Sequence, residues 1–421
     1  MKRLKSGVMT VRLGHVAQTA LGKMLQSRPL RGDDVEVAYL RAGLLGTTPE
    51  SPGDLPTMFA SPGEIDAYTV RCGDLLVAEG GDVGRAEFAP PVPTPTIIQN
   101  SLHRVRTETG DIRFLRYSLL ALKASGWLDV LVNRSTFGHL TVEKLRSLRV
   151  AWPPIDDQRA VADFLDEKTS KIDSLMAKNR RMIELLQQRA ARREAVAAWG
   201  EDRDDRVPCA PIGPIGALPR TWSRLRNKVF ASEATDRSKD GSEELLSVSH
   251  LTGVTSRAEK NVTMFMAESL DGYKLVQPGD LVINTMWAWM GAAGVSRQPG
   301  IVSPAYGVYR FDQSIMLPAY YDILVRTPAY VTEMTRFSRG VWTSRLRLYP
   351  DEFLRLSAPV PPLEEQSEIV KRVSEANVLA HRSITKLERA VDLLNERRQA
   401  LITAAVTGEL DVAHAIAEEA S

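Results

Sequence analysis

Two long stretches of the chain contain neither proline nor glycine and have apolar residues at helical spacing. The first runs from Asp156 to about Trp199, and the second runs from Glu364 to about Thr407. Each follows a Pro-Pro pair and has acidic residues in its first turn, and both features favour a helix N-terminus. The pattern therefore predicts two helices of about 40 residues, each about 60 Å long at ~1.5 Å per residue.

Apolar residues in these helices recur at alternating steps of four and three, as in a coiled-coil seam. The second seam consists of Ile369, Val373, Ala376, Ala380, Ser383, Leu387, Ala390, Leu394, Leu401 and Ala404. The first consists of Leu165, Ile172, Leu175, Met182, Leu186 and Val196, interrupted by Asn179, Arg189 and Arg193. Because the seams share a phase, we predict that the helices pair antiparallel and hold two globular domains a fixed distance apart. The alternative is two amphipathic helices, each packed on its own domain.

The chain also contains an internal duplication. PPIDDQ at Pro153 matches PPLEEQ at Pro361, an offset of 361 − 153 = 208 residues. Further matches in the same order are Leu140 with Leu348, Leu145 with Phe353, Leu148 with Leu356, CGDLLV at Cys72 with PGDLVI at Pro278, IIQNSLHRVR at Ile97 with IVSPAYGVYR at Ile301, and RLGHV near Leu13 with RLRNKV near Leu225. Several ordered matches indicate two copies of one unit.

Each unit begins with a globular part of short β-rich runs, such as YTVRCGDLLVAE and GDLVINTMWAW, with helical stretches such as FLRYSLLALKASGW. The fold class is therefore α+β, with two tandem mixed globular domains joined by the antiparallel coiled coil. The predicted boundaries are 1–152 for the first domain, 153–206 for the first helix and linker, 207–360 for the second domain, and 361–421 for the second helix and C-terminal tail.

Composition narrows the class of protein. A length of 421 residues suggests two or three domains, and a net charge of +2 excludes a binder that relies on charge alone. No stretch of about 18 apolar residues and no secretory signal is visible, so a cytoplasmic protein without a membrane partner is expected. Cys72 and Cys209 are isolated, which argues against a disulfide framework or a zinc site.

The motifs of an enzyme are missing from the sequence. The Pro-Pro pairs follow Trp152 and Val360, so neither forms the NPP-aromatic or DPP-aromatic motif of an adenine methyltransferase. No GxxxxGK[ST] phosphate loop is present, and no histidines occur at metal-ligand spacing. Asp74 and Asp280 in the GDL motifs are expected to form turns before core strands, and GGDVG at 80–84 is expected to be a tight turn. We therefore expect no catalytic residue, no metal site and no cofactor on this chain.

The organisation resembles that of the specificity subunits of type I restriction-modification systems. The resemblance covers essentially the whole chain and depends on the PP(I/L)(D/E)(D/E)Q repeats, the GDL strands, INTMWAWMGAAGV in the second domain and the ending AAVTGELDV. After the first helix the chain reads WGEDRDDRVP, so the first copy lacks a TGELDV-like tail.

The resemblance implies two target recognition domains that each read one half of a split sequence in double-stranded DNA. It also implies docking of two methyltransferase subunits and, for cleavage, a restriction/translocase subunit. S-adenosylmethionine, ATP and Mg would then be bound by the partner subunits. An alternative is a specificity subunit of a methylation-only or other DNA-modifying defence assembly. Two further alternatives are disfavoured. The missing motifs argue against a fused methyltransferase-nuclease, and the divergent polar loops argue against a coiled-coil adaptor.

Base reading in the major groove needs donors such as Arg and Asn, with phosphate contacts from Lys, Arg, Ser and Thr. Polar loops precede the leucine-rich lead-in of each copy and offer Asn133, Arg134, Ser135, Thr136 and His139 in the first domain, and Arg339, Trp342, Thr343, Ser344, Arg345 and Arg347 in the second. Ordinary solvated loops are an equal alternative for any single residue. Weaker candidates are Glu79–Arg85, Gln99–Asn100, Ser249–His250, Ser303–Tyr306, and Trp287 and Trp289, which could equally pack inward. Because the two loops differ, an asymmetric target is expected.

Overall fold

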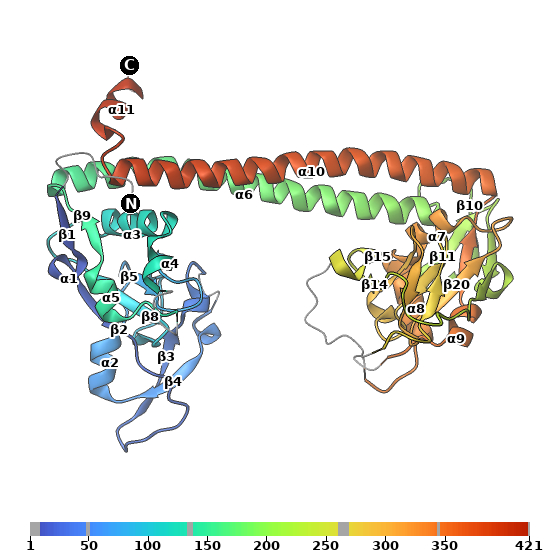
Figure 1. The fold of residues 1–421 in the computed structure, drawn as a ribbon, viewed down its shortest axis with the longest axis horizontal. Coiled ribbons are helices and arrows are strands. Elements are labelled where there is room, and N and C mark those ends of the chain that lie inside the picture. Colours follow the sequence, from blue (N-terminus) through green and yellow to red (C-terminus); the bar gives the residue numbers. More distant parts are fainter. Residues whose placement is uncertain (1–8, 48–50, 133–137, 260–268, 343–345, 420–421) are drawn as a thin grey trace. The chain divides into compact units, whose positions relative to one another are not determined.

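The structure is a computed structural model that describes residues 9–47, 51–132, 138–259, 269–342 and 346–419. It divides into two compact units. The first comprises Met1–Arg180 together with Arg389–Ser421, and the second comprises Arg181–Glu388. Each unit therefore contains one globular domain and one half of each long helix (Figure 1).

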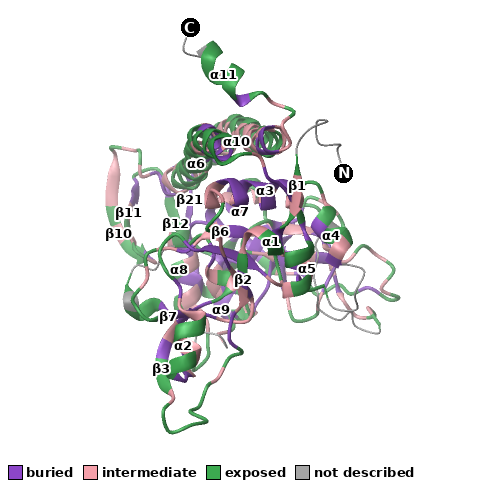
Figure 2. Cartoon of the chain, turned by 90° about the vertical axis from the view of Figure 1, so that its left-hand side faces the viewer, coloured by how far each residue is buried: buried purple, intermediate pink, exposed green. Residues whose placement is uncertain are grey.

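The first domain is built around a four-stranded antiparallel sheet with the order β2-β8-β5-β6. A second sheet, β4-β3-β7, has a parallel β3–β7 pair, and β1 pairs with β9. The elements are β1 (Thr10–Arg12), α1 (Leu13–Val16), β2 (Gln18–Leu21), β3 (Val35–Leu40), η1 (Ala42–Leu44), η2 (Pro52–Asp54), β4 (Thr57–Ala60), α2 (Pro62–Tyr68), β5 (Leu75–Ala78), β6 (Ala86–Phe88), β7 (Thr96–Ile98), β8 (Leu102–Arg106), α3 (Ile112–Ala124), α4 (Trp127–Val132), α5 (Val142–Ser147) and β9 (Arg149–Ala151). Helix α3 buries six residues, whereas α2 buries none (Figure 2).

The second domain repeats this plan, with a four-stranded sheet of order β13-β20-β17-β18. Its elements are β10 (Arg206–Ile212), β11 (Ile215–Pro219), β12 (Ser223–Arg226), η3 (Asn227–Val229), β13 (Ala231–Glu233), β14 (Leu246–Ser249), β15 (Gly253–Ser256), η4 (Arg257–Glu259), β16 (Lys274–Val276), β17 (Leu281–Ile283), η5 (Ala288–Met290), β18 (Ala293–Val295), β19 (Gly300–Val302), β20 (Gly307–Phe311), α7 (Pro318–Val325), α8 (Pro328–Phe337), α9 (Pro350–Arg355) and β21 (Ser357–Val360). The predicted duplication is thus present in the sheet order.

Strand register confirms which residues are equivalent. Leu75 lies opposite Val105 in the first sheet, and Leu281 lies opposite Tyr309 in the second. One predicted match is shifted, however. The N–H of Leu13 donates to the Leu148 carbonyl, and the same bond to the equivalent Leu356 carbonyl comes from Asn227. Asn227, and not Leu225, therefore takes the place of Leu13.

The long helices are α6 (Ile155–Trp199) and α10 (Leu363–Val406), close to the predicted bounds, and a short helix, α11 (Val412–Glu419), follows α10. Within the first unit Arg398 pairs with Asp173 at 2.9 Å, and within the second unit Asn377 donates to Glu194 at 2.5 Å. Asp173 thus lies beside Arg398 and Glu194 beside Asn377, so residue numbers rise along α6 as they fall along α10. The predicted antiparallel pairing is confirmed.

The predicted seam is wrong by one residue at several positions. Leu175 and Met182 are each 49% exposed, whereas the neighbouring Met176 is buried and Ile183 is half-buried. In α10 Ser383 is exposed, and the half-buried residue is Ile384. The predicted seam and the observed seam both alternate steps of four and three. The contacts with the partner helix and with the domain therefore decide which of the two is buried.

No single helix in the described ranges is both long and apolar enough to cross a membrane. Helix α10 is long enough but does not meet the composition by itself; α10 and α11 meet both only as a pair, and the chain bends by 120° between them.

A buried glutamine attaches each long helix to its own domain. Gln366 is fully buried, accepts from the Leu317 N–H at 2.8 Å, and donates to the carbonyls of Ile315 and Pro361. Gln158, its equivalent, accepts from the Asp111 N–H at 3.0 Å and donates to the Pro153 carbonyl. Because a side-chain amide can both donate and accept, it satisfies backbone groups on both sides of the junction. This explains why both copies of the Pro-Pro motif, PPIDDQ and PPLEEQ, end in glutamine.

Replacing Gln366 by leucine should therefore destabilise the second unit. The substitution leaves one N–H and two carbonyls without their partner, and we expect a loss of roughly 2–4 kcal/mol in the free energy of unfolding. Gln158→Leu removes two bonds and should cost less. Glu364→Gln, at an exposed position two residues away, is the control. Urea unfolding followed by tryptophan fluorescence measures the change, and a loss below about 1 kcal/mol in Gln366→Leu would contradict the role.

Candidate nucleic-acid interface

The GDL aspartates form turns that begin the central strands. Asp74 accepts from the Arg71 N–H at 2.7 Å and pairs with Arg106 at 2.5 Å. Asp280 accepts from the Gln277 N–H at 2.8 Å and lies 3.4 Å from Arg310, and burial raises its pKa. The predicted turn role is confirmed in both domains. The strands that follow, β5 and β17, are buried at every residue, so their C-terminal ends are held rigidly.

The loops predicted to read DNA are attached to the ends of these strands by equivalent backbone hydrogen bonds. In the first domain the Leu140 N–H donates to the Glu79 carbonyl at 2.8 Å. In the second domain the Leu348 N–H donates to the Thr285 carbonyl at 3.0 Å. Each loop therefore emerges beside the turn that follows the central strand, and the same scaffold presents different side chains in the two domains.

Only the last predicted residue of the first loop lies in the described part of the chain. Asn133, Arg134, Ser135 and Thr136 lie outside the described residues. The His139 side chain is half-exposed, and its Nδ1 lies 3.2 Å from Glu79 Oε2. A Cβ at Gly80 would approach His139 Nδ1 to 3.1 Å, so the glycine makes room for the ring. Gly81 and Gly84 have positive φ values, as expected of the predicted tight turn.

A buried histidine, which sequence reasoning did not single out, forms a hydrogen bond at the end of the first loop. His103 on β8 is fully buried, and its Nε2 lies 2.5 Å from the Leu140 carbonyl oxygen. Because a carbonyl only accepts, Nε2 carries the proton and donates. Its Nδ1 has no hydrogen-bond partner within the described residues. Burial lowers the pKa of His103, so the neutral ring is favoured.

In the second domain Arg339 and Arg347 close the loop through two backbone hydrogen bonds of 2.8 and 2.9 Å. Thr343, Ser344 and Arg345, between them, lie outside the described residues. The guanidinium of Arg339 pairs with Glu352, lies 3.2 Å from Asp351 and lies over the ring of Tyr349. Glu352 raises the pKa of Arg339. Arg339 therefore fastens the base of the loop to α9.

The outer part of this loop is exposed and apolar. Trp342 is 69% exposed and Val341 is 93% exposed. Arg347 is also exposed, and its side chain has no hydrogen bond or ion pair with any residue that the structure describes. Among the predicted residues of this loop that the structure describes, Trp342 and Arg347 are exposed and Arg347 has no ion pair, so both side chains are open to a ligand. The sequence analysis did not name Val341 as a candidate. Its position could have suggested a role, because an apolar residue in a polar loop, between a glycine and a tryptophan, belongs to no predicted core strand or helix.

The neighbouring MWAW segment adds a second aromatic side chain. The sequence predicted a strand through this segment, but β17 ends at Ile283 and the following residues form a turn and the 3-10 helix η5. Trp287 is 50% exposed, whereas the Trp289 Nε1–H donates to the Met286 carbonyl at 3.0 Å and Trp289 is half-buried. The turn breaks the alternation on which the strand prediction depended, and one tryptophan faces solvent.

Most of the weaker candidates bond to their own surroundings. Gln99 donates to Asn100, Asp82 pairs with Lys123, and the Ser249 hydroxyl lies 3.0 Å from that of Thr252. The Tyr306 hydroxyl accepts from Asn284 at 3.1 Å. No group of three or more His, Cys, Asp or Glu in the described ranges could hold a metal ion.

Three comparisons place this architecture among known proteins. Residues 5–185 match the family model described as type I restriction modification DNA specificity domain. The chain is 24% identical over 406 residues to the type I restriction enzyme EcoBI specificity subunit of Escherichia coli, covering 90% of this chain and 81% of that protein.

One solved structure shows the same fold, and a second is reported for its sequence identity. A structure described as the structural basis of complex assembly and conformational transition of the type I R-M system has a TM-score of 0.62 at 16% identity, over 97% of this chain and 100% of that chain. The HsdS subunit from Thermoanaerobacter tengcongensis is 17% identical, with a TM-score of 0.44 over 97% of this chain and 98% of that chain.

Lowering the pH should destabilise the first domain through His103. Burial holds the folded-state pKa below the ordinary value of 6.5, so the unfolded chain binds a proton more readily and stability falls as pH drops through that value. Exchange of the β5 and β8 amides, corrected for intrinsic rates, should accelerate between about pH 7.5 and about pH 5.5. In His103→Gln, whose amide can still donate to Leu140 but does not titrate, this pH dependence should vanish. Its persistence would assign the effect to another group.

Proposed function

The chain belongs to the DNA specificity subunits of type I restriction-modification systems, and from this premise we propose that its two domains read the two parts of a split, asymmetric DNA target. Methyltransferase subunits dock on the paired helices, and a restriction/translocase subunit joins for cleavage. The family is non-catalytic, so methyl transfer and cleavage belong to these partners, together with S-adenosylmethionine, ATP and Mg.

One observation carries this proposal. The bond from Leu140 to Glu79 and the bond from Leu348 to Thr285 present a loop at the same place in each domain. His139 beside a glycine turn occupies that place in the first domain, and Trp342 with Arg347 occupies it in the second. A duplicated scaffold with exchanged surface side chains is suited to read different bases with one docking geometry, which is the basis for expecting an asymmetric target.

The exposed residues have the chemistry that base reading requires. An arginine whose guanidinium is not engaged by the protein can donate two parallel hydrogen bonds to guanine O6 and N7. An exposed tryptophan can contact a thymine methyl group or stack on a base that is partly unstacked. Arg339 is held by Glu352 and Asp351, so its contribution is to position the loop.

The helices supply the spacing in this proposal. Helices α6 and α10 each run without a break through both units, and they pair within each unit. A continuous helical pair is stiffer than a flexible linker, so the gap between the two parts of the target is set by helix length.

Arg347→Ala and Trp342→Ala test the loop. If Arg347 donates to a base, its loss should weaken binding of the specific site by roughly 1–3 kcal/mol and relax the choice at one position. Trp342→Ala should weaken specific binding with little change in the salt dependence. Arg224→Ala, at an exposed position on β12, is the matched control. Binding is measured on specific and scrambled DNA over a salt series. Equal weakening on both DNAs would indicate a phosphate contact, and unchanged binding would remove this loop from the interface.

Lengthening both helices tests the spacing. Four residues added after Arg180 and four after Glu388 should extend the pair by about 6 Å, or about two base pairs at ~3.4 Å each. A methylation map of a genome that carries the variant with its methyltransferase should show a longer gap between unchanged half-sites. Replacing four residues at each position without changing the length is the control. A gap that never responds, or half-sites that change, would contradict the proposal.

A further inference from the structure

Two neighbouring apolar side chains are exposed on the turn that follows the central strand β17 of the second domain. Met286 is 37% exposed and Trp287 is 50% exposed. The residues on either side of this pair, Thr285 and Ala288, are buried. The turn itself therefore packs on the domain, whereas the side chains of the pair are directed into solvent.

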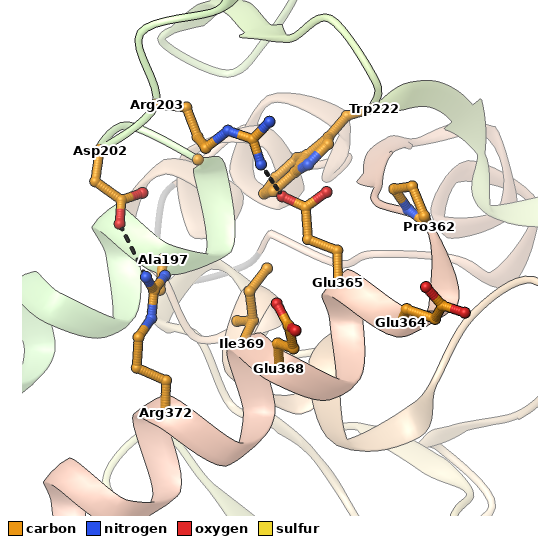
Figure 3. A pocket seen from close by; sticks show the side chains of 11 residues that line it. Ala197, Asp202, Arg203, Trp222, Pro362, Glu364, Glu365, Glu368, Ile369 and Arg372 are labelled. Carbon is orange, nitrogen blue, oxygen red and sulfur yellow. Dashed lines mark hydrogen bonds and ion pairs between the residues drawn. The ribbon is translucent and has the colours of Figure 1, made fainter.

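A hollow elsewhere in this unit contains a tryptophan as well, but that side chain is covered. Figure 3 shows the hollow beside the end of α6 and the beginning of α10, where Arg203 pairs with Glu365 at 2.5 Å and Arg372 pairs with Asp202 at 3.3 Å. Trp222, which lines it, is only 8% exposed. The pair on the turn, in contrast, is accessible to a ligand.

Hydrogen bonds and close packing fix the conformation of this turn. The Met286 N–H donates to Asn284 Oδ1 at 3.2 Å, and the Trp287 N–H donates to the Asn284 carbonyl at 2.9 Å. Gly291 has a φ of 83°, and a Cβ at this position would approach Val331 Cγ2 on α8 to 3.0 Å. The turn is thus held against α8, and a ligand that binds the exposed pair does not have to order it first.

The surface that this turn presents is mainly apolar. Residues 284–291 include no charged side chain. The polar side chains of Asn284, Thr285 and Trp289 donate hydrogen bonds within the domain, at 3.1, 2.8 and 3.0 Å. What remains outside is the thioether of Met286 and the indole of Trp287, which suit an apolar group of a ligand better than a phosphate.

The turn lies beside the loop that is proposed to read DNA. The Thr285 carbonyl, directly before Met286, accepts from the Leu348 N–H at 3.0 Å, and Arg347 comes directly before Leu348. One backbone hydrogen bond therefore holds Met286 and Trp287 next to Arg347. Because successive base pairs are ~3.4 Å apart, the pair and the arginine can contact neighbouring base pairs.

The first domain has only backbone at the equivalent place. Leu281 of β17 corresponds to Leu75 of β5, an offset of 281 − 75 = 206 residues. At this offset the exposed pair corresponds to Gly80 and Gly81. Two glycines offer no apolar side chain to a ligand, so the two domains differ at this position in the chemistry that they present.

We propose that Met286 and Trp287 contact the C5-methyl group of a thymine in the part of the target that the second domain reads. The inference rests on the proposed reading of DNA by this domain and adds the chemical group that is recognised. In the major groove guanine, cytosine and adenine display hydrogen-bond donors and acceptors, whereas thymine also displays a methyl group. An uncharged apolar pair on a rigid turn complements that methyl group. The thymine lies within one or two base pairs of the base that Arg347 contacts, and the glycines of the first domain make no such contact.

Replacing thymine by deoxyuridine tests the proposal on the unaltered protein, because this change removes only the methyl group. A methylation map of a genome that carries the chain with its methyltransferase first gives the target, and exchange of residues 207–360 for those of another family member identifies the part that the second domain reads. Binding of the assembled complex is then measured on duplexes with one thymine replaced at a time. We expect one replacement in that part to weaken binding by about fourfold, the effect of one buried methyl group.

Variants of the turn assign the effect to this pair. In Trp287→Ala the difference between thymine and deoxyuridine at that position should disappear, whereas Trp287→Phe, which keeps an aromatic ring, should retain it. Trp342→Ala is the matched control, because it removes an exposed tryptophan from the neighbouring loop and should leave this difference in place. Replacements in the first part of the target should have the same effect in Trp287→Ala as in the unaltered chain.

Three results would overturn the assignment. They are a second part of the target without thymine, equal affinity for thymine and deoxyuridine at every position of that part, and a difference that persists in Trp287→Ala. A complex that binds no split target at all would instead overturn the proposed reading of DNA.

Discussion

The buried carboxamides of Gln158 and Gln366 are the contacts through which each long helix acquires its position on a domain. Each amide lies where a Pro-Pro pair has removed backbone donors, and each bonds a carbonyl of that pair and an N–H at the start of the helix α3 or α7. No shorter or purely apolar side chain could both donate and accept at this junction. The proposed spacing role depends on this attachment of each helix to its own domain.

The two domains retain their backbone plan while exchanging the side chains that stabilise it. His103 holds the Leu140 carbonyl in the first domain, whereas its counterpart in strand register, Gly307, leaves room for the hydroxyl of Tyr309. Leu13 packs in the first core, whereas Asn227 donates to the Phe353 carbonyl and bonds the Tyr330 hydroxyl in the second. Such exchanges show that the sheet order tolerates different interiors, and the proposal that each domain reads its own bases needs the same tolerance at the surface.

Sequence reasoning singled out the two loops that are proposed to read DNA, but it did not distinguish their residues. Arg339 and Arg347 look alike in the sequence, yet the guanidinium of Arg339 pairs with Glu352 thirteen positions away, whereas that of Arg347 has no ion pair with a described residue. The sequence contained no signal for this difference, because the pairing arises when the loop closes against α9. The contact of His103 with the Leu140 carbonyl likewise joins residues that are distant in the chain.

The amino-acid sequence by itself determined the duplication, the two helices, the turns of the GDL motifs and the family. These features depend on local spacing, on proline and glycine, and on recurring motifs, and each can be recognised over a short window. The tertiary structure decided which face of each helix is buried, since two neighbouring seams have similar apolar content and the contact with a partner helix selects between Leu175 and Met176. It also decided which side chains of a loop are free, because ion pairs and hydrogen bonds between distant residues form only after the chain has folded.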